Sequence, residues 1–317
     1  MKKHWWKVLL AVVVVLVVGG IAAFVIADRK FAILKSPPWP YSPYVTPDTR
    51  LQLAVWPERA TDTVTTLMET ALPENRRPSN WVLQRVLPRQ TAIFMAPDMA
   101  RAMVDITVFV NDQRLGPVFR DTVNSANIAK SVPTVDWAAE GMVLEQRGVL
   151  TLRGEAPIDP LTMQLTQETW SKDEVTEALP LEGGHAAEMV LDNRDGGAFA
   201  ILSALELLQG DQGKNDPEFF VGMFANIQAI RILADLPKPE DAGIIIRIEC
   251  RPEVEEDIPG SLQFFLDMGI NQAKKTLQAR GAAVTGASRI EGKTIVGEYT
   301  ISGLDKLVPQ HAQPAGN

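Results

Sequence analysis

The segment with the clearest chemical potential is Ala287–Thr294, which reads ASRIEGKT. A small residue, four others and then Gly-Lys-Thr is a loosened form of the phosphate-binding loop, whose backbone amides and lysine surround phosphate groups. That loop must lead from a strand into a helix, whereas the residues after Lys293 are β-branched and alternate as in a strand. Glu291 would also place a negative charge beside the phosphate. The segment therefore predicts a β-hairpin turn.

Two acidic segments raise the question of a metal site. Asp192–Gly196 reads DNRDG, but a helix-loop-helix calcium loop needs oxygen ligands at its first, third and fifth positions and glycine at its sixth. Arg194 holds the third position and Gly196 the fifth, so we expect a turn between a strand and a helix. The run Glu253–Asp257 would gather a cation or pair carboxylates only if it were enclosed. Its composition favours a solvated turn.

Sequence spacing provides no cysteine or histidine site. Cys250, the one cysteine, ends an apolar segment typical of a strand, so we expect a buried thiol, the alternative being a reactive one. The three histidines, His4, His185 and His311, do not have the spacing of metal ligands. The sequence also contains no Gly-x-Ser-x-Gly nucleophile motif. We therefore predict no catalytic residue, no metal ligand and no cofactor. A hydrolase whose carboxylates converge only in the fold is the remaining catalytic alternative.

Two other groups have the character of binding residues. Four arginines form a basic spot that would suit an anionic partner or lipid head group, unless they are ordinary exposed helix residues: Arg76, Arg77, Arg85 and Arg89. Six apolar residues would suit a lipid-like ligand in a sheet-helix groove, unless they are simply core: Phe219, Phe220, Met223, Phe224, Ile227 and Ile230.

The elements that would position these groups follow an apolar segment, Val8–Ala27, of twenty uncharged residues. That length is enough for a helix to cross the roughly 30 Å hydrocarbon core of a bilayer. Trp5 and Trp6 stand where aromatic side chains meet the membrane interface. A cleaved signal peptide is the alternative, with a site at Ala27, but its apolar run is usually about 7–15 residues. We predict an uncleaved transmembrane anchor.

The orientation of this anchor rests on its flanks. Three basic residues precede the anchor and three follow it, so their balance alone decides nothing: Lys2, Lys3 and Lys7 against Arg29, Lys30 and Lys35. Long domains are translocated largely regardless of their charge, and a short lysine-rich tail normally stays in the cytoplasm. We expect residues 1–7 to be cytoplasmic and the main domain to be periplasmic, held on a bacterial inner membrane.

The composition limits the class of partner. Hydrophobic residues make up 46% of the chain and charged residues 22%, which is typical of a globular protein. The net charge is −8, and residues 1–35 contribute six basic side chains and one acidic, so residues 36–317 carry −13. A domain this acidic repels nucleic acid and anionic lipid. One cysteine also excludes an internal disulfide.

A proline-rich segment follows the anchor. Residues 36–47 contain five prolines in twelve positions, which favours an extended polyproline path of about 3.1 Å per residue. We expect residues 28–48 to form a stiff stalk, the alternative being a docking peptide for a groove lined with aromatic residues.

The rest of the chain predicts two similar α+β units, 49–160 and 186–308. In the first, apolar residues that alternate with polar ones predict strands, and apolar residues spaced three or four apart predict helices. The predicted strands lie at 51–56, 91–96, 102–110, 141–146 and 149–155, and the predicted helices at 62–72, 79–87 and up to 129. The second has the same order: strands at 186–191, 229–234, 243–250, 283–290 and 294–301, and helices at 198–208, from 216, and from Ser261 to Gly281.

Local matches support a duplication. Residues 104–110 match 244–250, and 146–155 resemble 290–298. Corresponding positions lie about 136 to 144 residues apart, and small insertions and deletions account for the drift. Strands joined by short turns pair antiparallel, and helices bury their apolar stripes on a sheet. The expected fold class is therefore α+β: a transmembrane helix, then a duplicated antiparallel sheet with helices on one face. Residues 161–185 are expected to be an irregular connector and 309–317 a disordered tail.

These features favour a membrane-anchored, extracytoplasmic binding or structural protein of the cell envelope. It would act without catalysis, through an envelope protein partner. A carrier or sensor of an apolar ligand is the first alternative, and the carboxylate hydrolase is the second.

Overall fold

The computed structural model describes residues 44–71, 77, 89–111, 136–145, 149–170, 175–208 and 217–307. The predicted anchor, most of the predicted stalk and the tail lie outside these residues. Within the described part, no helix has the length and apolar character needed to cross a membrane. The transmembrane segment at Val8–Ala27 therefore stays a prediction.

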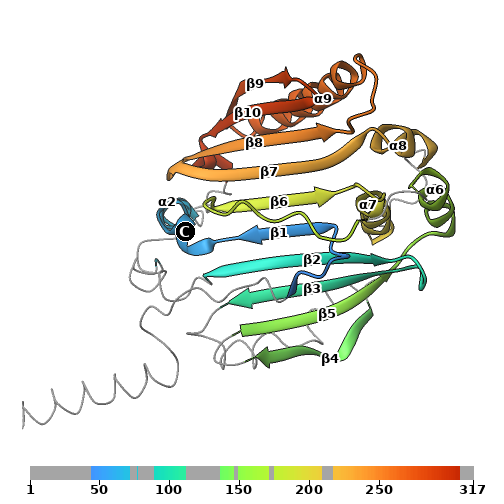
Figure 1. Ribbon diagram of the computed structural model, residues 1–317. Helices are drawn as coiled ribbons and strands as arrows, with labels where there is room; N and C mark the ends of the chain where they lie inside the picture. The colour runs from blue at the N-terminus through green and yellow to red at the C-terminus, as the bar shows by residue number, and fades with distance from the viewer. Residues whose placement is uncertain are drawn as a thin grey trace, which may run out of the picture.

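The architecture is one antiparallel sheet of ten strands with helices (Figure 1), in the order β4-β5-β3-β2-β1-β6-β7-β8-β10-β9. This confirms a mixed fold dominated by a large antiparallel sheet. The strands are β1 (Leu51–Val55), β2 (Gln90–Asp98), β3 (Met103–Asn111), β4 (Asp136–Glu145), β5 (Val149–Pro157), β6 (Ala187–Asp192), β7 (Ile227–Lys238), β8 (Asp241–Cys250), β9 (Ala283–Glu291) and β10 (Thr294–Ser302).

The two predicted units share this sheet, because β1 pairs with β6 along its whole length, from Leu51 opposite Leu191 to Val55 opposite Ala187. On either side of this junction the strands follow the same order: β1-β2-β3-β5-β4 and β6-β7-β8-β10-β9. The halves therefore have the same strand order, counted outward from the β1–β6 pair.

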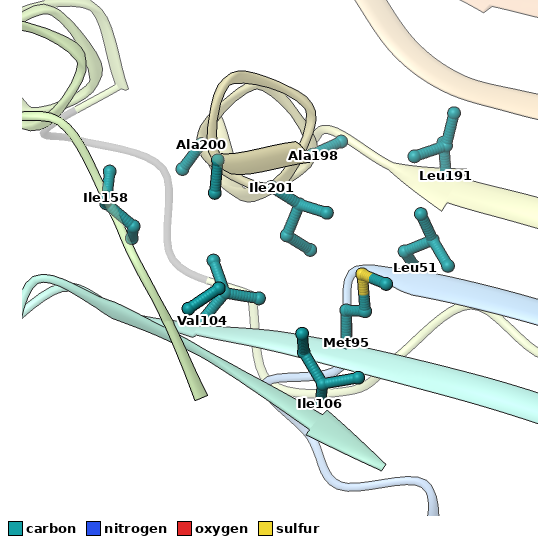
Figure 2. Packing of buried hydrophobic residues seen from close by; sticks show 11 residues of the cluster. Leu51, Met95, Val104, Ile106, Ile158, Leu191, Ala198, Ala200 and Ile201 are labelled. Carbon is teal, nitrogen blue, oxygen red and sulfur yellow. The ribbon is translucent and has the colours of Figure 1, made fainter. Parts of the chain in front are cut away.

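Helices α7 (Gly197–Leu208), α8 (Pro217–Phe224) and α9 (Ile258–Gln278) lie on one face of the sheet. Directly opposed residues of neighbouring strands share a face, and one row runs across five strands through Leu51, Leu191, Ile230, Ile248 and Ile295. Figure 2 shows Ile201 of α7 packed over the β1–β3 end of this face. Leu262 of α9 covers Ile248 and Ile295 at the other end. The row therefore joins two cores into one layer.

The opposite face is covered in the first half by extended chain. Tyr44, Val45 and Leu181 pack on a buried cluster of Ala54, Trp56, Ala92, Phe94 and Phe109, and the rings of Tyr44 and Phe109 lie 5.0 Å apart. The end of the predicted stalk and part of the predicted connector thus lie flat on the sheet.

The connector segment is held there by polar side chains of the strands. Both carboxylate oxygens of Glu188, a fully buried residue, accept backbone N–H groups, from Glu182 at 2.5 Å and Gly183 at 2.9 Å. Gln52 donates to the carbonyl of Leu179 at 2.5 Å, and Arg231 to that of Pro180 at 2.9 Å. Buried polar groups need such partners, so these bonds fix the path of the segment.

Two local predictions are wrong. Residues expected to be an irregular connector begin with a helix, α6 (Pro160–Trp170). Asp159 caps it, accepting the N–H groups of Leu161 at 2.9 Å and Thr162 at 3.2 Å. Helix α9 begins at Ile258 after Asp257, whereas the prediction placed its cap at Ser261. Pro259 suits the first turn, where its missing N–H costs nothing.

The other elements agree closely with expectation. Helix α2 (Thr61–Ala71) follows the short 3-10 turn η2 (Pro57–Ala60), and η4 (Leu304–Leu307) ends the described chain. Strand β2 continues through Pro97, so its turn comes later than predicted. The helices predicted at 79–87 and up to residue 129 lie outside the described residues.

Candidate functional site

The Ala287–Thr294 segment is the β9–β10 hairpin, so the phosphate-loop alternative is excluded. Its nine pairs run without interruption to Glu291 opposite Thr294. Gly292 has a positive φ of 63°, as a tight turn requires. The ammonium group of Lys293 donates to the carbonyls of Pro252 and Val254. It fastens the hairpin to the β8–α9 loop.

The Asp192–Gly196 turn is a structural junction. Asp192, almost fully buried, accepts two hydrogen bonds from the guanidinium of Arg194, at 2.8 and 2.6 Å. These contacts raise the pKa of Arg194. Asp195 accepts two from Arg50, both at 2.7 Å, across the junction of the two halves. Because arginines hold both carboxylates, the turn offers no calcium ligand set.

Asn193 is the most enclosed polar residue of that turn. Its amide donates to the carbonyls of Phe224 at 2.8 Å and Ile227 at 3.2 Å and accepts the N–H of Phe199 at 3.2 Å. It therefore links β6 to the start of α7 and to the end of α8. A Cβ at the next glycine, Gly196, would lie 2.5 Å from the Trp170 ring, so the turn is also closely packed.

The predicted thiol, histidine and acidic run have ordinary roles. Cys250 is buried, as expected, and burial raises the pKa of its thiol, which keeps it unreactive. His185 pairs with Asp235 at 2.8 Å; His4 and His311 lie outside the described residues. In Glu253–Asp257 the acidic side chains are exposed. No cluster of three metal-ligating side chains occurs among the described residues.

The structure describes two of the four predicted arginines, Arg77 and Arg89, and they differ in exposure. Arg89 is 6% exposed and lies 4.0 Å from Glu58. Arg77 is exposed and donates to the carbonyl of Glu69 at 2.7 Å. Arg76 and Arg85 lie outside the described residues.

The predicted apolar group is divided between core and pocket. Phe224 is buried against Phe199, and Ile227 is 2% exposed, so these two belong to the core. Met223 faces a pocket. The side chains of Phe219 and Phe220 are outside what the structure describes.

This pocket, which we call the α8–α9 pocket, has a volume of about 310 Å³. Its wall is almost entirely apolar, and it is open to solvent. The lining includes Met223 and Asn226 from α8 and the turn after it, and Ile258, Leu262 and Phe265 from α9. Asn226 donates its amide to the carbonyl of Gly222 at 2.9 Å, so this polar group is partly satisfied by the wall itself.

An exposed group of large side chains on α9, which we call the aromatic rim, reaches the pocket through Phe265. We define it as Phe264, Phe265 and Met268, which are 65%, 36% and 55% exposed. The two phenylalanine rings meet edge to face with centroids 6.0 Å apart. A second recess of about 710 Å³ lies along α9 beside Phe264 and Met268. Large side chains exposed together on one helix are unusual in a monomer and typical of an interaction site.

The inner side of α9 is fixed to the hairpin by a polar contact. The hydroxyl of Ser288 donates to Asp267 at 2.7 Å and accepts the amide of Gln263 at 2.9 Å. Burial, with the nearby Asp267 carboxylate, raises the pKa of Tyr299 beneath it. This contact fixes the rotation of α9 and so directs the aromatic rim outward.

Sequence reasoning missed the rim. A helical period along α9 places Phe265, Gly269 and Ala273 on one apolar stripe, but all three are exposed. The signal was present: Phe264 and Met268 lie four residues apart and off the stripe, so they share a second side of the helix. Helix α6 also had a recognisable start in the sequence. The pair Asp159-Pro160 is a helix-start signal of the same kind as Asp216-Pro217, which precedes α8.

Comparisons with known proteins add a distant structural likeness. No family model matches this chain, and no curated protein matches its sequence. The solved structure described as "Structure of crystal form I of TP0453" aligns with 82% of this chain and 91% of that chain at 9% identity, with a TM-score of 0.33. A likeness at this level supports no statement about function.

Proposed function

We propose that this protein is a non-catalytic binding protein that recognises a protein partner through the α8–α9 pocket and its aromatic rim. The observation that carries the proposal is the exposure of Phe264, Phe265 and Met268 together on α9, where Phe265 also lines an apolar pocket. Aromatic side chains around a pocket are the usual centre of a protein interface, because a few buried anchors supply most of the binding energy.

The size of the pocket favours a side chain over a whole ligand. Pockets for drug-sized ligands run from about 300 to 1,000 Å³ and enclose most of the ligand. The α8–α9 pocket, at about 310 Å³, is at the lower limit and is open. A partner would insert an apolar side chain there and cover the rim around it.

The charge of the domain defines the partner further. Residues 36–317 carry −13, which favours association with a basic or neutral surface. In α9, Lys274 and Lys275 lie one to two turns beyond Met268 and are the local exception.

A carrier of an apolar ligand is the second candidate, and one observation favours it. The wall of the pocket is almost wholly apolar, as a site for a single acyl or aromatic group requires. For the hydrolase no supporting observation was found.

The location and ancestry are part of the same proposal. Residues 8–27 would hold the protein in a bacterial inner membrane, with the described domain in the periplasm. The strand order that the halves share supports an origin by duplication of one unit, 49–160 and 186–308.

Photo-crosslinking of the full-length protein in its native membrane tests the function. p-Benzoylphenylalanine would replace Phe264 or Met268 and, as a matched control, Thr300, which is exposed on β10. We expect one discrete protein adduct from positions 264 and 268 and none from 300. Lipid adducts alone at 264 and 268 would favour the carrier. Equal labelling at all three positions would contradict both.

A further inference from the structure

The two edges of the sheet, β4 and β9, hold equivalent places in the two halves but differ in regularity (Figure 1). The β4–β5 ladder changes register between Trp137 and Met142. Strand β9 pairs with β10 through nine consecutive positions without a shift. Among the described strands, none pairs with the outer edge of β9. A regular edge strand exposes backbone N–H and C=O groups that another strand can pair with.

Strand β9 has little of the usual protection of an edge. Proteins guard exposed edges with charged side chains, proline, a bulge or a short strand, and of these the nine residues of β9, AVTGASRIE, have only two charges near one end. Its two charges, Arg289 and Glu291, pair with each other at 2.6 Å, and Arg289 also binds Glu298 at 2.8 Å. The segment from Ala283 to Ser288 is uncharged.

We propose that β9 pairs with β9 of a second copy of this chain, antiparallel and centred on Ala287. This register places Val284 of each copy opposite Ile290 of the other, on the face that carries α9. Ile290 is one of the large exposed apolar residues, at 42%, and the partner's strand would cover it. On the other face Thr285 stands opposite Arg289. No like charges oppose each other, so the strand is complementary to itself.

Other occupants from this chain fit less well. The proline-rich residues 36–47 lack the N–H groups that a ladder needs at five of twelve positions. Helix α9 covers β9 on one face, through Ser288. On the opposite face Ala283, Thr285 and Ala287 are exposed. Side chains of a second copy paired at the β9 edge would therefore meet no covering segment on that face.

Disulfide trapping in the full-length protein tests the register. Cys250 is buried, so an introduced cysteine is the reactive one. Directly opposed residues of antiparallel strands have Cα atoms about 4.5–5.5 Å apart, within reach of a disulfide. With mild oxidant we expect Ala287→Cys to form a covalent dimer with itself.

Ala283→Cys is the matched control, because it is equally exposed on the same strand. In the proposed register two copies of position 283 lie about 27 Å apart, eight residues at about 3.4 Å each. Ala283→Cys alone should stay monomeric, whereas a mixture with Glu291→Cys should crosslink. Equal crosslinking of Ala283→Cys and Ala287→Cys, or none by Ala287→Cys, would overturn the proposal. Dimerisation through the membrane anchor cannot reproduce the register dependence.

Charge at position 285 gives an independent readout. Thr285→Lys would face Arg289 of the other copy twice per dimer, and Thr285→Glu would form two ion pairs with it. Sedimentation in detergent should show the dimer dissociation constant rise with lysine and fall with glutamate, each by about twofold to thirtyfold. Equal constants for both variants would contradict the pairing. The α8–α9 pocket takes no part in this contact, so either proposal can fail without the other.

Discussion

The two halves of the molecule have the same strand order. They differ in how far the sheet is covered on the face that lacks the long helices. One row of opposed residues crosses that face through eight strands: Phe109, Ala92, Ala54, Glu188, Leu233, Ile245, Glu298 and Ala287. At the β3 end Phe109 is fully buried by the chain that arrives from the stalk. At the β9 end Ala287 is exposed. The face is therefore covered from β3 as far as β7, where Leu233 is 1% exposed, and open at β9.

The open end of this face meets solvent with a charge pair between strands. Arg289 of β9 lies 2.8 Å from Glu298 of β10. Cross-strand pairs of opposite charge stabilise a sheet modestly and keep its face soluble. The comparison teaches that one strand order is compatible with two different ways of covering a sheet.

The largest expected effects come from the core of either half. Phe109→Ala should lower the free energy of unfolding by about 3–5 kcal/mol, and Ile295→Ala by about 2–5 kcal/mol. Both side chains are fully buried, so each substitution leaves a cavity in the core. Since β1–β6 pairing joins the halves, calorimetry should show one transition that shifts in both variants. Two transitions, each sensitive to one substitution, would separate the halves.

The junction between the halves should be the next most sensitive place. Asn193→Ala removes three hydrogen bonds to backbone groups in a buried turn, which should cost about 2–4 kcal/mol. Asn271→Ala is the control, since Asn271 is exposed on α9, and we expect a change within about 0.5 kcal/mol. Denaturant unfolding measures both. Similar losses for the two variants would refute the role of Asn193.

A smaller effect concerns acid pH, where each half has one arginine shared by several carboxylates. Arg101 binds Asp98, Asp105 and Glu155, and its hydrogen bond lowers the pKa of Asp98. Arg289 likewise lowers the pKa of Glu298. A carboxyl whose pKa is lower in the folded state stabilises the fold above its ordinary pKa, and this stabilisation is lost as the pH falls through the lowered value.

Carboxyl NMR titration checks this prediction. Asp98 should titrate below 3.8 and Glu298 below 4.5, the ordinary values for these groups. Arg101→Met should return Asp98 toward its ordinary pKa and leave Glu298 unchanged, and Arg289→Met should do the reverse. A response of both carboxyls to one substitution would show that the halves are electrostatically coupled.

The smallest expected effect lies on the outer side of α9. Phe264→Ser should change the free energy of unfolding by less than about 0.5 kcal/mol, because the side chain is 65% exposed. Leu262→Ala, on the inner side, should cost about 2–5 kcal/mol. Thermal unfolding distinguishes them. A large loss with Phe264→Ser would mean that the aromatic rim serves the fold, which would weaken the proposed function.

Much of the fold was predictable because its signals are local. Alternation of two residues located every described strand to within a few positions, as at 283–290 against β9 (Ala283–Glu291). Short turns set antiparallel hairpins such as β9–β10. The failures had local signals too: the Asp159-Pro160 start of α6 was overlooked among the prolines around it.

The candidate site was less predictable. Of the six apolar residues singled out, Met223 reaches the α8–α9 pocket, while Phe224 and Ile227 are core. Hydrophobicity along the chain does not distinguish a residue that packs inward from one that lines a pocket. That depends on how α8 and α9 approach each other, which is set by residues far apart in the sequence.

The sequence alone determined the strands, the hairpins, the order of elements that the halves share, and the failure of the phosphate and calcium patterns. Tertiary structure decided that β1 and β6 join the halves, that Arg50 holds Asp195, and that Phe264 points to solvent. The physical reason is range. A period of two or of 3.6 residues is encoded within one segment, whereas strand pairing, buried ion pairs and pockets require surfaces that meet only when distant segments pack.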